Sequence, residues 1–274
     1  MLGKLLKHEF RATARIQLPF LLMVAAATLL LVCLVAVHQA MPERNILYTV
    51  TNILIGILAF FYILGILAYI FAAHFCGVQR YYKNLFTDEG YLTLTLPVKN
   101  GYHQTVKLIV AVFWGIVSLV VTGLSVYALF SIGVMEIITP AEVWERATFY
   151  LAAAKVIGLI VLFAVTVLIA EISFFTMAYF CIAVGQTFSQ KHKVIAAFVT
   201  YLVISAALQI LSLILLGAGV VAFDDELTRL LSNNLPPFLV LTCVAITVDA
   251  ISLLLSGAMF GVTNYLTHRR LNLE

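Results

Sequence analysis

Charged residues are scarce in this chain of 274 residues: Asp, Glu, Lys and Arg make up 11% of it, whereas 63% of its residues are hydrophobic. An ordinary globular domain has roughly 25% charged residues. A water-soluble fold of this size would lack the polar side chains needed to cover its surface, and it would expose large apolar patches. The scarcity of charge excludes a soluble enzyme, a nucleic-acid-binding domain and a disordered regulator, and it indicates an integral membrane protein with no nucleic-acid partner.

The chain also lacks the motifs that carry common catalytic and metal chemistry. It contains no G-x-x-x-x-G-K-[ST] phosphate-binding loop and no H-E-x-x-H pair. Its four cysteines form no C-x-x-C pair, which is typical of free thiols packed among helices, and its six histidines are scattered. We therefore expect no enzyme activity, no catalytic residue, no metal site and no cofactor in this chain itself.

Long apolar runs dominate what is present. A bilayer core about 30 Å thick requires roughly 20 apolar residues per helix. Six runs are long enough, over residues 16–37, 47–75, 108–133, 156–185, 194–221 and 238–266. The sequence predicts an all-α polytopic membrane protein, in which residues 1–274 form a single transmembrane domain with six spans.

Basic residues gather on one side of these spans. The N-terminal segment, residues 76–107, the loop between the fourth and fifth spans and the C-terminal tail hold 12 of the 16 Lys and Arg residues. By the positive-inside rule, that side is cytoplasmic. Both termini then lie inside, which agrees with an even number of spans, and the expected location is the cell (plasma) membrane.

Residues 1–15 have two different faces when they are read as a helix. The apolar side chains fall near one face: Leu2, Leu5, Leu6 and Phe10. The basic side chains lie mostly elsewhere: Lys4, Lys7, Arg11 and Arg15. This pattern predicts an amphipathic interfacial helix on the cytoplasmic leaflet, and the alternative is a frayed basic tail that only sets the topology.

A few polar side chains inside the spans are candidates for a substrate pathway. Glu171 and Asp249 fall near the middle of the fourth and sixth spans, where an ionised carboxylate is unfavourable. They either line a pathway or relay protons, or they are neutral carboxyls hydrogen-bonded to a neighbouring helix. The fifth span carries a polar stripe of Tyr201, Ser205, Gln209 and Ser212. This stripe is either a packing seam or a translocation surface.

Residues 76–107 form the longest polar interruption on the predicted cytoplasmic side. This is the only inside loop large enough to offer a specific docking surface. Its acidic residues, Asp88 and Glu89, are accompanied by the aromatic residues Tyr81, Tyr82, Phe86 and Tyr91. We expect the aromatic side chains to contribute contact area to that surface.

Part of this loop resembles the cytoplasmic signature of the type-2 ABC exporter permeases. In that family an acidic residue and Gly precede a Leu-rich segment, then Pro-Val, then a Lys that opens the next span. Glu89-Gly90-Tyr91-Leu92, Pro97-Val98-Lys99 and Val106-Lys107 stand in those places, with Tyr91, Thr93 and Val106 departing from the family pattern. The run R-Y-Y-K-N-L-F-T-D-E-G-Y-L-T-L-T-L-P-V is similar to permeases of Gram-positive bacteria, and the layout of six spans agrees over the whole chain.

The resemblance implies the transmembrane permease subunit of a bacterial ABC exporter. Such a subunit pairs with a second permease half, identical or different, and with cytosolic ABC ATPase subunits that hold ATP and Mg. The exported substrate would be an antimicrobial peptide, a lipid or a drug, and no residue here selects among them. The implied ATPase-docking residues are Arg80, Lys83, Asp88, Glu89, Gly90, Tyr91 and Pro97, with Gln186, Lys191 and Lys193 in the next inside loop.

Two other functions stay open at the level of the sequence. A proton-coupled secondary transporter would use Glu171 and Asp249, and its transport would follow a pH gradient. A non-transporting membrane scaffold or sensor subunit would need neither residue. The chain shows no convincing internal repeat and no proline in the middle of a span, two features that often accompany secondary transporters.

Overall fold

The computed structural model describes residues 2–42, 46–87, 90, 100–132, 142, 144–145, 153–188, 193–232 and 237–269. Within these residues the chain forms six long α-helices and no strand. They are α1 (Leu2–Gln39), α2 (Ile46–Phe86), α4 (Asn100–Phe130), α6 (Ala153–Phe188), α7 (Lys193–Ser232) and α8 (Pro237–Arg269). Each is long and apolar enough to cross a bilayer, which confirms the predicted all-α polytopic membrane protein.

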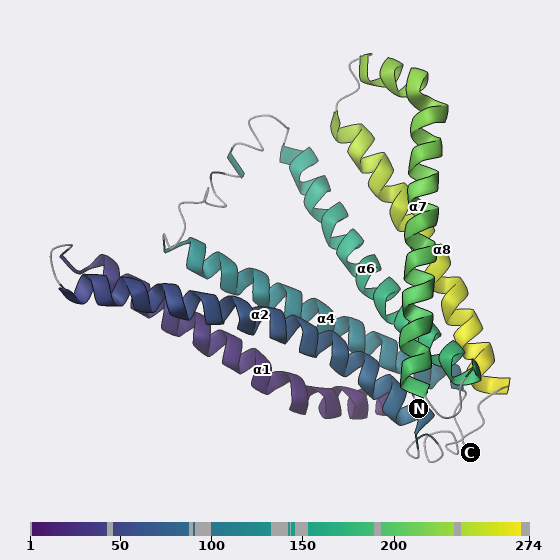
Figure 1. Cartoon of the computed structure of the whole chain (residues 1–274), viewed down its shortest axis with the longest axis horizontal. Helices are drawn as coiled ribbons and strands as arrows, with labels where there is room; N and C mark the ends of the chain where they lie inside the picture. The colour runs from purple at the N-terminus through teal and green to yellow at the C-terminus, as the bar shows by residue number, and fades with distance from the viewer. Residues whose placement is uncertain are drawn as a thin grey trace. The chain divides into compact units, whose positions relative to one another are not determined.

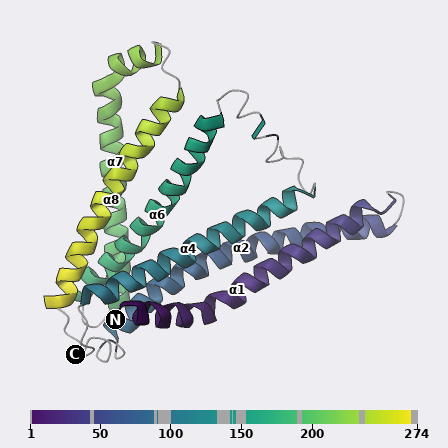
Figure 2. The ribbon, with the colours of Figure 1, turned by 180° about the vertical axis from the view of Figure 1, so that it is seen from behind.

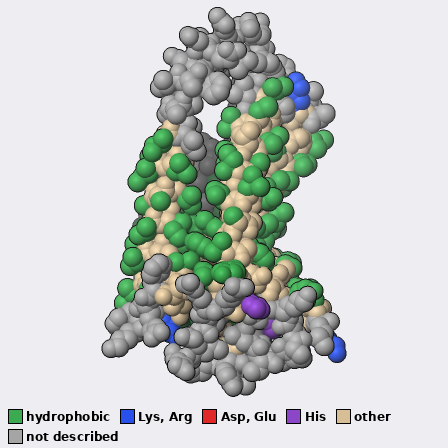
Figure 3. Space-filling view, turned by 90° about the vertical axis from the view of Figure 1, so that its right-hand side faces the viewer, with side chains coloured by type: hydrophobic (Ala, Val, Ile, Leu, Met, Phe, Trp, Pro, Cys, Tyr) green, Lys and Arg blue, Asp and Glu red, His purple; other side chains and the backbone are tan. Residues whose placement is uncertain are grey.

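The surface of the helices is apolar over most of its length. Large side chains such as Leu22, Phe71 and Leu254 are 63%, 71% and 74% exposed. Figure 3 shows hydrophobic side chains covering the described helices on the face drawn there. A surface of this kind is unfavourable in water and suits contact with lipid acyl chains.

The chain divides into two compact units, and their boundaries fall inside helices. The first unit holds Met1–Arg80 and Thr105–Ile157, and the second holds Tyr81–Gln104 and Gly158–Glu274. Helices α2, α4 and α6 therefore each contribute residues to both units. The two units are described separately below.

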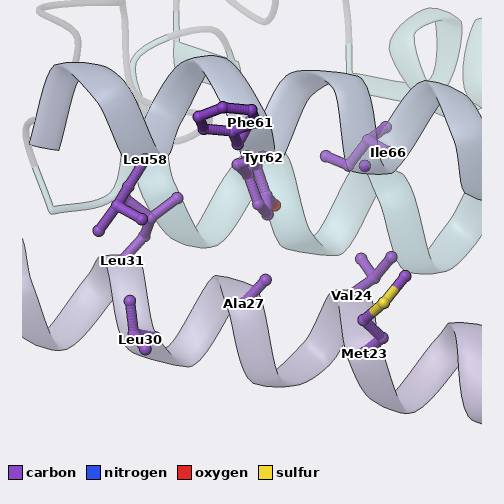
Figure 4. A pocket seen from close by; sticks show the side chains of 10 residues that line it. Met23, Val24, Ala27, Leu30, Leu31, Leu58, Phe61, Tyr62 and Ile66 are labelled. Atoms are coloured by element: carbon purple, nitrogen blue, oxygen red, sulfur yellow. The ribbon is translucent and has the colours of Figure 1, made fainter.

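The first unit is built from α1 and the longer parts of α2 and α4 (Figure 1). Its buried apolar cluster consists of Val24, Leu31, Tyr62, Ile66 and Tyr69. Tyr62 also forms a buried hydrogen bond of 3.1 Å with the Thr28 hydroxyl, which joins α1 to α2. Beside this cluster an apolar groove of about 300 Å³ runs between the two helices, and Figure 4 shows its lining side chains.

Helix α1 contains both the predicted interfacial segment and the first predicted span. The chain is helical from Leu2 onwards and continues without interruption to Gln39. Pro19 lies inside this helix, where its ring removes one backbone hydrogen bond and crowds the preceding turn. Figures 1 and 2 show that the N-terminal part of α1 turns away from the line of the rest of the helix.

The second unit contains most of α6 together with α7, α8 and the ends of α2 and α4. Two hydrogen bonds join α6 to α8: Thr166 donates to Asp249 at 2.7 Å, and Ser256 donates to Ser173 at 2.8 Å. Both pairs have the same sequence separation of 83 residues, so the partners on both helices advance in the same direction. Helices α6 and α8 are therefore parallel, as the predicted topology requires of the fourth and sixth spans.

Helix α7 lies very close to α6 at a glycine. A Cβ atom placed on Gly185 would lie 2.6 Å from the backbone nitrogen of Ala197 and 2.7 Å from its Cα. Any side chain at this position would force the two backbones apart, so the close approach requires glycine. Among residues 193–214 of α7, none is buried.

Candidate functional site

The implied docking residues that the structure describes lie on the last turns of α2 and α6, at Gly90 and at the start of α7. Helix α2 does not end with the apolar run at residue 75 but continues to Phe86. Arg80 and Lys83 therefore lie on a regular helix rather than in a loop. Lys83 is exposed, and Tyr82 beside it is half-buried.

Tyr81 lies in the interior of the second unit, which corrects the expectation that it offers docking surface. Its side chain is fully buried, and its ring stacks on that of Tyr179 with centroids 3.7 Å apart and planes 10° apart. Phe86 is 5% exposed and its ring lies 5.7 Å from that of Tyr81. The end of α2 therefore packs on the C-terminal half of α6 through aromatic contacts, because three large rings lie together in the interior of the unit.

Arg80 belongs to an ion cluster within the first unit. The Glu9 carboxylate accepts hydrogen bonds from Arg80 Nη2 at 2.7 Å and Nε at 3.2 Å, and from Lys107 Nζ at 2.6 Å. The side chains of Arg80, Glu9 and Lys107 are 23%, 17% and 5% exposed. One carboxylate therefore holds two cations from α2 and α4, and it fixes the N-terminal part of α1 against both helices.

Gly90 is buried and turns back towards α2. Its N–H donates to the Thr87 carbonyl at 2.7 Å. A Cβ atom on Gly90 would lie 2.6 Å from the Leu85 carbonyl oxygen, a distance that real Cβ atoms do not tolerate. Glycine is required here, and this is the glycine on which the resemblance to the permease signature rests.

The second inside loop begins and ends on half-buried residues. Gln186 is half-buried near the end of α6, and Lys193 is half-buried at the start of α7. The constrained Gly185 directly precedes Gln186, and nothing in the sequence pattern marks it as a site of close helix contact. A glycine at the end of an apolar run is the one feature that could have indicated this position. Such a glycine is equally typical of a helix end and of a close contact between two helices. The other implied docking residues, Asp88, Glu89, Tyr91, Pro97 and Lys191, lie outside the described residues.

The two acids within the spans are both buried. Glu171 is 6% and Asp249 is 8% exposed, on α6 and α8 of the second unit. Asp249 accepts the hydrogen bond from Thr166 described above. This contact is the arrangement expected of a carboxyl that packs between helices, and a role in a substrate pathway stays a prediction.

The polar stripe of the fifth span lies on the weakly packed part of α7. Tyr201 and Ser205 are half-buried, whereas Gln209 and Ser212 are exposed. The two serine hydroxyls donate to carbonyls of their own helix, at Leu202 and Gln209, and so need no partner from outside. The amide of Gln209 remains on the surface at the middle of the span. The role of the four residues in a pathway stays a prediction as well.

No group of three or more His, Cys, Asp or Glu side chains in the described part of the chain is placed to hold a metal ion. Comparison with known proteins adds no relative, since no protein-family model, curated protein or solved structure matches the chain. The fold defines the class as an all-α integral membrane protein with six helices able to span the bilayer. Any function beyond that class has to be inferred from the residues themselves.

Proposed function

We propose that this chain is the transmembrane permease subunit of an ABC exporter in the bacterial cell membrane. The observation that carries the proposal is the construction of the inner end of α2. That helix continues past its apolar run to Phe86, and Gly90 then folds back against Leu85 within the stretch that resembles the permease signature. A helix end that packs closely against the glycine beyond it suits an element that receives force from a docked protein.

The mechanism follows from what the inner end of α2 contacts. ATP binding and hydrolysis would take place in separate cytosolic ATPase subunits, because this chain has no phosphate-binding loop. Closure of those subunits would push on residues 76–107. The stack of Tyr81 on Tyr179 would pass the movement from α2 to α6, and the two hydrogen bonds between α6 and α8 would carry α8 along. Movement of several spans together is what opens a transport pathway outward.

A docking variant tests this function directly. We expect Lys83→Glu, which reverses an exposed charge at the inner end of α2, to abolish co-purification of the chain with cytosolic ABC ATPase subunits. Lys155→Glu is the matched control, because Lys155 is also exposed and lies at the opposite, predicted outer end of α6. If the chain transports substrate in liposomes with no ATPase present, the proposal is wrong.

A second candidate, a proton-coupled secondary transporter, is favoured by one observation: both acids within the spans are buried. It predicts transport driven by a pH gradient and lost in Glu171→Gln, because the amide cannot release a proton. Under the ABC proposal the same variant keeps ATP-dependent transport within about tenfold of the wild type, a loss of about 1.4 kcal/mol at most. Transport assays in liposomes, with either a pH gradient or ATP as the energy source, separate the two candidates.

A further inference from the structure

The basic residues at the N-terminal end of α1 form a single stripe. Lys4, Lys7, Arg11 and Arg15 follow one another at spacings of three, four and four residues, which places them on one face of the helix. All four side chains are exposed. Within the part of the chain that the structure describes, no ion pair joins any of them to an acid. We call these four residues the basic stripe.

The opposite face of the same segment is already occupied by the protein. Glu9, the only acid among residues 1–15, is directed to Arg80 and Lys107. The Phe10 ring packs edge-on against Phe113 with centroids 4.9 Å apart, and Gln17, further along this face, donates to the Ala73 carbonyl at 3.3 Å. The apolar face therefore packs on α2 and α4, and the face left for an outside partner is the basic one.

The exposed face of α1 changes from basic to apolar between Arg15 and Leu18. Leu18, Leu22 and Leu29 continue the stripe at helical spacing, and they are 46%, 63% and 65% exposed. Exposed leucines on a spanning helix contact acyl chains. The cations on the preceding turns of the same face consequently lie where the headgroups of those same lipids begin.

The dimensions agree with this placement. Arg15 and Leu18 are separated by about 4.5 Å along the helix axis. The headgroup region adds only about 5–7 Å on each side of the hydrocarbon core. Arg15 lies within this layer. Arg11 is about 10 Å from Leu18 along the axis, and its long side chain can reach the outer edge of the layer, whereas Lys4 is about 21 Å from Leu18.

We propose that the basic stripe binds the headgroups of anionic phospholipids in the inner leaflet. Charge complementarity at headgroup depth favours this occupant. Four cations with no acid partner among the described residues lie in line with lipid-facing leucines, and the inner leaflet is the anionic one. The proposal does not depend on the proposed transport function. A permease, a secondary transporter or a scaffold subunit with this helix would bind the same lipids.

The test uses the purified full-length chain in detergent, titrated with phosphatidylglycerol or phosphatidylcholine and analysed by native mass spectrometry for bound lipid. We expect a clear preference for phosphatidylglycerol, and we expect that preference to weaken as salt is raised, because exposed charges are screened. Arg11→Gln/Arg15→Gln should reduce the preference about tenfold, since each cation near an anionic surface contributes up to about fivefold. Lys4→Gln/Lys7→Gln should reduce it less.

The control variant keeps all four positive charges but exchanges the ammonium and guanidinium groups. We expect it to bind phosphatidylglycerol like the wild type, and it carries the changes Lys4→Arg/Lys7→Arg/Arg11→Lys/Arg15→Lys. Each double variant retains two basic residues, which leaves the signal for membrane orientation in place. The proposal is overturned if the wild type shows no preference between the two lipids. It is equally overturned if Arg11→Gln/Arg15→Gln keeps the full preference.

Discussion

Glu9→Gln is expected to lower the free energy of unfolding of the purified chain by about 3 kcal/mol. The reason is the composition of the ion cluster, in which one carboxylate neutralises two cations. Without it, the side chain of Lys107, which is only 5% exposed, would keep its charge in a nearly dry site. A glutamine has a single acceptor oxygen and adds two donors, so it cannot replace both contacts. Thermal unfolding in detergent measures the change.

The partners of Glu9 make the prediction specific. Lys107→Met should cost much less than Glu9→Gln, because it leaves a balanced pair between Glu9 and Arg80. The double variant Glu9→Gln/Lys107→Met should recover part of the loss, since only one cation then remains unneutralised. Glu142→Gln serves as the control for removing an acid, because Glu142 is exposed. Equal losses in Glu9→Gln and Glu142→Gln would contradict the role of the cluster.

A second measurement separates loss of this contact from general unfolding. Glu9 fixes the N-terminal part of α1 to α2 and α4, so its loss should free that segment first. Trypsin cuts after Lys and Arg, and the exposed basic stripe offers four such sites on this segment. We expect faster cleavage among residues 4–15 in Glu9→Gln at temperatures where the six spans are still folded.

The main architecture could be predicted from the sequence because the membrane imposes a simple rule. Every spanning helix must be long and apolar, and the predicted spans all lie within helices or end close to them. The ends of the helices were less predictable. Helix α2 continues to Phe86 and α4 begins at Asn100, well beyond the apolar runs. The hydropathy of a segment indicates where it leaves the lipid. A helix that packs on other parts of the protein can continue beyond that point.

Pairings between distant residues could not be predicted. Glu9 meets partners 71 and 98 residues away, and Asp249 meets Thr166 at a separation of 83. Helical periodicity gives the face on which a residue lies but not the helix that packs against it. One signal for Glu9 was available, since it is an acid on the apolar side of an amphipathic segment and would need a cation there.

Tyr81 was expected on the surface of a loop, and it is buried in a helix. An aromatic residue in a polar loop is typical of a contact surface. The predicted loop over residues 76–107 contains four such residues that were expected to form one. Helix α2 continues to Phe86, so Tyr81 lies on a buried face of that helix that also includes Ala73 and Leu85. The spacings of eight and four residues are helical, and they would have indicated burial if the helix had been extended past residue 75.

Tyr81→Ala is expected to have an effect as large as that of Glu9→Gln, with a loss of about 3–5 kcal/mol. The substitution empties a site in which the tyrosine is fully buried and stacked on Tyr179. The remaining rings are already engaged, because Phe86 lies 5.7 Å from the Tyr81 ring and Phe175 lies 6.3 Å from the Tyr179 ring, so the space is not readily refilled. Unfolding of the purified chain in detergent measures the loss.

Tyr81→Phe is the matched control. The hydroxyl of Tyr81 is buried and has no hydrogen-bond partner among the described residues. Its removal therefore sacrifices no bond and relieves the cost of a buried unpaired group. We expect Tyr81→Phe to be as stable as the wild type or slightly more stable. A loss in Tyr81→Phe as large as in Tyr81→Ala would mean that the hydroxyl, and not the ring, holds the end of α2.

The same pair of variants separates stability from coupling. If the ring stack carries movement from α2 to α6, Tyr81→Ala should retain the ATPase subunits on co-purification but lose most substrate transport. Lys83, the proposed docking residue, is exposed and unchanged, whereas the ring contact proposed to pass force onward is gone. Tyr81→Phe, which keeps the stack, should transport normally. Normal transport by Tyr81→Ala, assayed below its unfolding temperature, would show that movement reaches α6 by another route.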